Sequence, residues 1–298
     1  MTSDNTLGAV SALWRFPVKS MGGEQPAAVE LSARGVLGDR AYALIDAESG
    51  KVVSAKSVKL FPGLLQCHAA FSTEPQANQP LPPVRITLAN GTAVTSDAPD
   101  VDRVLSAYFG RAVRLAQAAP ADYTIDQYHP DVAGADPAGH RDVIVEQQLG
   151  SAFFAAAGMD SPVPVGAFFD LFPVSVMTTA TLAHLGALEP TSRFDQRRFR
   201  MNVIVESNAE GLVENGWIGR AIALGSTARL RVTLPDPRCV MTTLPQDDLP
   251  NDPGVLRALV RHNRLDVAGA LFPCAGVYAV VEAAGTLRRG DAVRHVAD

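Results

Sequence analysis

The chain has 298 residues, of which 47% are hydrophobic and 19% charged, as in a folded protein large enough for two domains. Its formal net charge of -5 argues against a surface made for nucleic acid or for an anionic membrane. No stretch has the uninterrupted apolar length that crosses a bilayer, and residues 1–10 lack the pattern of an export signal. We therefore expect no nucleic-acid partner, no membrane insertion and no export.

The first third of the sequence predicts β-structure. Short runs rich in apolar and β-branched residues, separated by turn formers, occupy residues 9–16, 27–31, 41–45 and 51–55. Asn90-Gly91 supplies the positive φ angles of a tight turn and predicts a hairpin with strands at 84–88 and 92–95. Residues 100–109 have apolar side chains at helical spacing, and Gly110 follows them as a C-terminal cap.

Residues 116–151 show weak periodicity and many Ala, Asp, Gly and Pro, which is typical of a connector. We therefore expect an N-terminal domain at 1–115, a connecting loop at 116–151 and a second domain at 152–298.

The second domain begins with a strand-like run at 168–177. A threonine of the following Thr-Thr-Ala-Thr segment is expected to cap a helix. Another helix is expected at 253–262, and further strands at 202–206, 221–224, 230–234 and 277–281. Many short strands with few helices predict a mainly β protein with some α+β character, built as two β-barrels with short peripheral helices.

The three cysteines are odd in number, far apart and without CxxC spacing, so they predict neither a disulfide framework nor a zinc or iron–sulfur site. They are Cys67, Cys239 and Cys274, and this usage fits a reducing cytoplasm. The histidines lack two-histidine metal spacing, and we assign no role to His129, His140, His184 or His262.

Cys239 lies in a short polar loop that follows a strand-like run. The neighbouring Arg238 favours the charged thiolate, which is the reactive and metal-binding form of cysteine. A lone cysteine is also an ordinary small packing residue, so this loop alone leaves both interpretations open.

Three other segments place polar groups at turns. Residues 15–23 present Lys19 and Ser20 after a proline, and residues 35–40 form a glycine turn that ends in Asp39 and Arg40. Residues 197–202 bring three arginines and Asn202 to the start of an apolar strand. Each segment alone also fits a solvated surface or a weak salt bridge.

Together, these segments resemble the MOSC-domain proteins, named for the C-terminal domain of molybdenum cofactor sulfurase, and most closely the branch that includes the amidoxime-reducing components. Phe-Pro-Val-Lys-Ser at 16–20 and Gly-Val-Leu-Gly-Asp-Arg at 35–40 resemble the family's N-terminal β-barrel domain. Arg-Phe-Arg-Met-Asn at 198–202 resembles Arg-Phe-Arg-Pro-Asn, from which Met201 departs. Arg-Cys-Val-Met-Thr-Thr at 238–243 resembles Arg-Cys-x-x-Thr-Thr.

The resemblance implies a molybdenum–molybdopterin cofactor (Moco) with Cys239 as the protein's thiolate ligand on molybdenum and as the catalytic residue. It also implies that other residues hold the cofactor, with Thr178 and Thr179 in a strand-to-helix turn that takes the pterin phosphate. These residues are Lys19, Ser20, Arg40, Thr178, Thr179, Arg200, Asn202 and Arg238.

The activity implied by the resemblance is reduction of N-hydroxylated or N-oxygenated compounds. The sequence lacks the clustered cysteines of a ferredoxin domain, so electrons would come from a separate flavoprotein, ferredoxin or cytochrome. Two alternatives stay open. One is a cofactor or sulfur carrier, related to the sulfurase, that uses a Cys239 persulfide. The other is a cofactor-free binding module that kept the fold.

Overall fold

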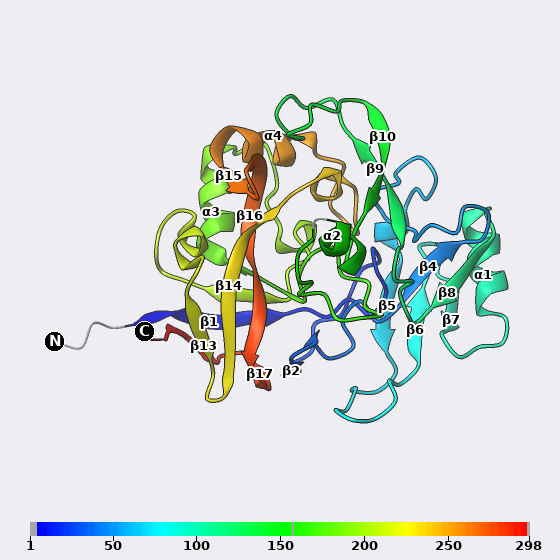
Figure 1. Ribbon diagram of the computed structural model, residues 1–298, viewed down its shortest axis with the longest axis horizontal. Helices are drawn as coiled ribbons and strands as arrows, with labels where there is room; N and C mark the ends of the chain where they lie inside the picture. Colours follow the sequence, from blue (N-terminus) through cyan, green and yellow to red (C-terminus); the bar gives the residue numbers. More distant parts are fainter. Residues whose placement is uncertain (1–4, 157, 297–298) are drawn as a thin grey trace.

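The computed structural model describes residues 5–156 and 158–296, and it contains a closed barrel, whose labelled strands lie in the left part of Figure 1. Seven strands follow one another around it, and the last pairs with the first. β11 and β12 are parallel, and the other neighbours are antiparallel. In order around the barrel the strands are β11 (Val174–Thr178), β12 (Val203–Glu206), β1 (Thr6–Leu13), β18 (Ala292–His295), β13 (Ala221–Leu224), β14 (Ala228–Pro237) and β16 (Ala270–Ala283).

The barrel closes around a core of small branched side chains. Val176, Val203, Ile222, Leu230 and Val277 are fully buried in one cluster. The two longest strands, β14 and β16, shift register at three places, where irregular pairing lets the sheet bend. The start of β16 extends beyond the barrel and pairs with β15 (Arg264–Val267). This extension brings the end of β14 and the start of β16 to the same side of the barrel.

The N-terminal part consists of small sheets, most of which pack around a separate core, whereas Val29 and Leu31 of β2 and Val36 of β3 belong to the core of the barrel. The predicted hairpin is confirmed, with Gly91 at φ 86°, and the predicted helix α1 (Val101–Phe109) ends at Gly110 with φ 64°. The other strands are β2 (Ala28–Ser32), β3 (Gly35–Val36), β4 (Ala43–Asp46), β5 (His68–Phe71), β6 (Val84–Thr87), β7 (Ala93–Thr95) and β8 (Val113–Ala116), and the 3-10 helix η1 spans Leu64–Gln66. Residues 51–55, expected as a strand, contribute a single bridge from Val52 to Ile45.

The two parts exchange strands. β1, from the N-terminus, lies between β12 and β18 of the barrel, and β17 (Gly285–Arg288) from the C-terminal part pairs with β2. In Figure 1 the blue strand β1 runs across the barrel strands β14 and β16. Each part therefore contains a strand that comes from the other part of the sequence. The boundaries 1–115 and 152–298 stay a prediction about domains.

Residues 116–151 are not the structureless connector that weak periodicity indicated. β9 (Thr124–His129) and β10 (Val143–Gln148) form an antiparallel hairpin in continuous register from Thr124 to Gln148. Most side chains of β10 are exposed, so backbone pairing with β9 holds the strand in place. Its sequence therefore lacks the alternation of apolar and polar residues that predicts a half-buried strand. In Figure 1 this green hairpin stands between the barrel and the N-terminal sheets.

The helices of the second half match their sequence signals. Thr178 caps α3 (Thr179–Leu188) by accepting a bond from the Thr181 amide, and Asp252 caps α4 (Pro253–His262). The strand expected at 168–177 begins only at Val174, because residues 168–173 cross the wall of a cavity described below. The remaining elements are α2 (Ser151–Ala156) and the 3-10 helices η2 (Gln196–Arg198), η3 (Val213–Trp217) and η4 (Val240–Thr243). Within the described residues, no helix is long and apolar enough to span a membrane.

Candidate functional site

A cavity of about 910 Å³ lies where the barrel, the N-terminal turns and the β9–β10 hairpin meet. Five of the segments that bring polar groups into it are the proline turn and the glycine turn of the N-terminal part, residues 168–172, the arginine turn before β12, and the loop after β14. Its charged and thiol-bearing residues include Lys19, Arg40, Lys56, Asp170, Arg200, Asp236, Arg238 and Cys239.

Cys239 lies at the start of η4, immediately after β14 ends at Pro237. Its carbonyl accepts bonds from the Thr242 amide at 3.2 Å and hydroxyl at 3.0 Å, while the Thr243 hydroxyl donates to the Val240 carbonyl at 2.7 Å. The two threonines therefore hold the turn that presents the cysteine. Cys239 is partly exposed to the cavity, whereas Cys67 and Cys274 are buried.

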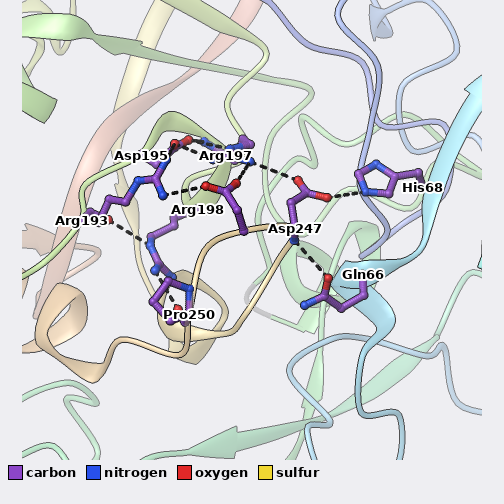
Figure 2. Close-up of polar contacts among 9 residues, drawn as sticks. Gln66, His68, Arg193, Asp195, Arg197, Arg198, Asp247 and Pro250 are labelled. Carbon is purple, nitrogen blue, oxygen red and sulfur yellow. Dashed lines mark hydrogen bonds and ion pairs between the residues drawn. The ribbon is translucent and has the colours of Figure 1, made fainter. Parts of the chain in front are cut away.

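Arg198 anchors the segment that follows Cys239 along the chain (Figure 2). This arginine is fully buried, and its guanidinium donates to the carbonyls of Thr242 and Leu244, both at 3.2 Å, and of Pro250 at 2.8 Å. A planar guanidinium can serve several acceptors in fixed directions at once. Arg198 thus fixes the course of the chain from η4 to α4.

The same segment is tied to the N-terminal part through Asp247 (Figure 2). The Asp247 carboxylate contacts His68 Nε2 at 2.7 Å and Arg197 at 3.3 Å, and its amide donates to Gln66 Oε1 at 3.0 Å. Arg197 also pairs with Asp195. The three arginines of the 197–202 segment therefore have separate tasks, and Arg200 is the one that lines the cavity.

Arg40 and Arg200 lie over the ring of Phe16, at 4.5 Å and 4.3 Å from its centroid. Arg40 donates to the Arg200 carbonyl at 3.0 Å, and Arg200 donates to the Met21 carbonyl at 2.8 Å. Burial, followed by the charge of Arg40, lowers the pKa of Arg200. Ser20, Arg40 and Arg200 have positive φ values of 65°, 47° and 56°. Such backbone conformations are costly for non-glycine residues and gather at functional sites.

Lys19 and Lys56 share the carboxylate of Asp170. Lys56 Nζ lies 2.9 Å from Oδ2, and Lys19 pairs with Oδ1 and donates to the Phe168 carbonyl at 2.9 Å. Burial lowers the pKa of Lys19, whereas for Lys56 the charges of Asp170 and Cys239 outweigh burial and raise the pKa. Burial raises the pKa of Asp170, but the two lysines dominate and the net shift is downward.

Arg238 pairs with Asp236 and donates to the Phe199 carbonyl at 2.6 Å. Its Nε is buried without a hydrogen-bond partner among the described residues, and so is Asp236 Oδ1. A buried polar atom without a partner costs free energy, so this corner of the cavity fits a ligand that offers a hydrogen-bond acceptor to Arg238 Nε and a donor to Asp236 Oδ1.

Two family models match the chain. The MOSC domain matches residues 165–294, and the MOSC N-terminal beta barrel domain matches residues 7–107. The chain is a MOSC-domain protein. No curated protein matches it significantly.

Among solved structures, the YUAD protein from Bacillus subtilis is 12% identical, with a TM-score of 0.44, over 98% of this chain and 97% of that chain. YiiM from Geobacillus stearothermophilus is 16% identical, with a TM-score of 0.31, over 42% of this chain and 54% of that chain.

Both matched domains contribute to the cavity. The N-terminal match contains Lys19 and Arg40, and the MOSC match contains Arg200 and Cys239. The β9–β10 hairpin lies between the two matched regions and forms a further wall. The MOSC cavity is therefore a shared product of both domains and the segment between them.

Seven of the residues singled out from the sequence meet around this MOSC cavity, and two do not. Those that line it are Lys19, Ser20, Arg40, Arg200, Asn202, Arg238 and Cys239. Thr178 and Thr179 are outside the lining. The Thr178 hydroxyl is fully buried, 2.7 Å from Glu214 Oε2, and accepts the capping bond of α3. The expected strand-to-helix turn is present, but the Thr178 hydroxyl is already hydrogen-bonded to Glu214 and to the Thr181 amide at the start of α3.

Lys56 and Asp170 were missed by sequence reasoning. Asp170 interrupts the apolar run Phe168-Phe169-Asp170-Leu171-Phe172, and a lone charge in such a run signals a buried, paired carboxylate. Lys56 directly follows the apolar segment 51–55 and carries the same signal. Each residue stands out within its own short segment, but the two residues pair with each other across 114 positions of the chain, from 56 to 170.

Proposed function

We propose that this MOSC-domain protein is a molybdenum cofactor-binding oxidoreductase that reduces N-hydroxylated compounds, with Cys239 as its ligand to molybdenum. The observation that supports it is the meeting of one partly exposed thiol with five cationic side chains in a single cavity. Nothing in a cofactor-free binding module requires that combination.

The residues present fit an anionic, sulfur-bearing cofactor. Five cations and four carboxylates line the cavity, and two of the carboxylates, Asp170 and Asp236, pair with three of the cations. The cations are Lys19, Arg40, Lys56, Arg200 and Arg238, and the other carboxylates are Asp136 and Glu146. Arg238 Nε has no hydrogen-bond partner among the described residues. A phosphate in a partly buried site needs paired cations and hydrogen bonds, and the cavity volume is in the range of cofactor sites.

Two cations lie beside the Cys239 thiol. Lys56 and Arg238 are close enough for electrostatic interaction with it, and Arg238 is also the preceding residue. Cysteine sulfur is a ligand for redox metals.

A bound molybdenum centre would supply the two-electron chemistry that cleaves an N–O bond. The balance is one N-hydroxylated substrate, two electrons and two protons, giving the reduced nitrogen compound and water. The chain's own residues would bind and orient the cofactor through Lys19, Arg40, Arg200 and Arg238. Phe153, Phe169, Phe172 and Phe272 line the same cavity and would exclude water from the substrate. Electrons would come from a separate donor protein.

The test is metal analysis and turnover of purified wild-type protein and a Cys239→Ala variant, expressed in a host with an intact molybdopterin pathway. Cys67→Ala is the matched control, since Cys67 is buried in the N-terminal core. Wild type and control should carry molybdenum and reduce an aromatic amidoxime with a chemical electron donor. Cys239→Ala should retain less molybdenum and should not reduce the amidoxime. Normal turnover by Cys239→Ala would refute the proposal, and a cyanide-labile sulfur on Cys239 without turnover would favour the sulfur-carrier alternative.

A further inference from the structure

The fold brings together two histidines that are eleven residues apart in the sequence. His129 is the last residue of β9, and Asp136 and His140 belong to the loop that joins β9 to β10. One ligand atom from each residue lies within 4.8 Å of the others. All three residues line the cavity, on the wall built by the hairpin.

The distances are close to those of a metal site. His140 Nδ1 is 2.6 Å from Asp136 Oδ2, and His129 Nδ1 is 3.7 Å from the same oxygen. A tetrahedral metal ion with ligands at about 2.0 to 2.1 Å holds neighbouring ligand atoms about 3.3 Å apart. Side-chain shifts of less than about 1 Å would bring these atoms to that spacing.

The ligands are held by a supporting shell. Gln147 Nε2, on β10, lies 3.2 Å from His129 Nε2. Turning this amide by 180° would let its oxygen accept from the His129 Nε2 proton and leave Nδ1 as the atom that faces the metal. Asp136 Oδ2 accepts the His140 amide at 3.0 Å, and the Gly139 amide donates to the Asp136 carbonyl at 3.0 Å. The loop is thus already folded into the arrangement that the ligands need.

We propose that His129, Asp136 and His140 bind a divalent transition-metal ion of the Zn²⁺ class, with an open coordination position on the cavity side. Two imidazoles and a carboxylate suit such ions, whereas Mg²⁺ and Ca²⁺ prefer oxygen ligands alone. Three protein ligands leave one tetrahedral position free, and His140 is the most exposed of them, at 40%. This site is separate from Cys239, and its existence does not depend on the proposed molybdenum chemistry.

The charged groups near the proposed site do not strongly repel a bound cation. Lys56 is the cation whose charge reaches His129, and it is paired with Asp170. Glu146 lines the same cavity and adds negative charge on β10. A bound ion would tie the 130–142 loop to β9 and stiffen the wall that faces the Cys239 loop.

The test is calorimetric titration of the full-length protein with Zn²⁺ after chelator treatment, with Mg²⁺ as a comparison. Wild type should bind one Zn²⁺ per chain saturably, and Asp136→Asn and His140→Ala should each weaken binding at least about tenfold. His68→Ala is the matched control, because His68 and Asp247 form a histidine–carboxylate pair at 2.7 Å outside the cavity.

A second control, Cys239→Ser, separates this site from the cysteine loop, and its Zn²⁺ affinity should equal that of wild type. With Co²⁺ in place of Zn²⁺, the visible spectrum should show no thiolate-to-cobalt charge-transfer band. Absence of saturable Zn²⁺ binding by wild type would overturn the proposal. So would unchanged binding in both ligand variants, or binding lost in Cys239→Ser.

Discussion

Asn202 donates a hydrogen bond from Nδ2 to Oδ2 of Asp39 at 2.9 Å, and this contact joins the MOSC domain to the glycine turn of the N-terminal domain. Both side chains are buried. Asp39 Oδ1 accepts the Phe16 amide at 2.7 Å, and Asn202 Oδ1 accepts the Ser175 amide at 3.1 Å. The pair therefore fixes the turn that carries Arg40 relative to the strand that follows Arg200.

Replacing Asn202 with leucine should destabilise the protein by roughly 2 to 4 kcal/mol, because it leaves Asp39 and the Ser175 amide buried with fewer partners. The measurement is the free energy of unfolding in urea. Asn215→Leu is the matched control, since Asn215 is partly exposed and makes one bond, at 3.0 Å, to Asn263. A loss for Asn202→Leu no larger than for the control would contradict a structural role for the contact.

The Asp170 carboxylate should stabilise the fold in a pH-dependent way. Its folded-state pKa is lowered, so its contribution is fully present above the unfolded value of about 3.9 and is lost as the pH falls through the folded value. Asp170→Asn should cost about 3 kcal/mol near neutral pH, because Lys19 and Lys56 lose their shared partner. The difference between wild type and variant should shrink between about pH 5 and about pH 3.

Urea unfolding of both proteins across that pH range is the measurement. Glu282→Gln is the control, because the Arg231–Glu282 pair lies at the surface and should be worth less than about 1 kcal/mol. A stability difference that stays constant from neutral to acidic pH would show that the carboxylate charge of Asp170 is not what stabilises the two lysines.

Arg198 should control how firmly the Cys239 loop is held. Arg198→Lys keeps the charge but cannot reach the carbonyls of Thr242, Leu244 and Pro250 together, so the loop should loosen. Alkylation of Cys239 in cofactor-free protein, followed by mass spectrometry, should become several-fold faster. Arg193→Lys, at a half-exposed position, should leave the rate unchanged.

The buried cysteines provide an internal standard for that experiment. Burial raises the pKa of Cys67, and it raises the pKa of Cys274 to about 12, so both should resist alkylation in every folded variant. Equal Cys239 rates in wild type and Arg198→Lys would contradict the positioning role. Alkylation of Cys274 at the same rate as Cys239 would instead report general unfolding.

Short-range chemistry explains which parts of the fold were predictable. Asn90-Gly91, Gly110 and Pro253 act within a few residues, so the hairpin, the end of α1 and the start of α4 followed directly from the sequence. The site residues of the four motifs also meet at one cavity because each motif sets its own turn, whereas Thr178 and Thr179, which belong to none of these motifs, lie outside its lining.

Long-range pairing explains what the sequence did not reveal. β1 joins a barrel whose other strands begin at residue 174, and Lys56 finds Asp170 across the cavity. The β9–β10 hairpin has an exposed second strand without apolar alternation, so neither its strands nor the approach of His129 to His140 was readable as a periodic pattern. The spacing of residues along the chain does not reveal such long-range contacts.

The most direct test of the central claim is molybdenum X-ray absorption of the purified protein, which counts the sulfur ligands on the metal. Wild-type protein should show one more sulfur ligand than molybdenum-loaded Cys239→Ala or Cys239→Ser protein, because Cys239 supplies the additional thiolate. Identical sulfur coordination in wild type and variant would contradict the assignment of Cys239 as the molybdenum ligand.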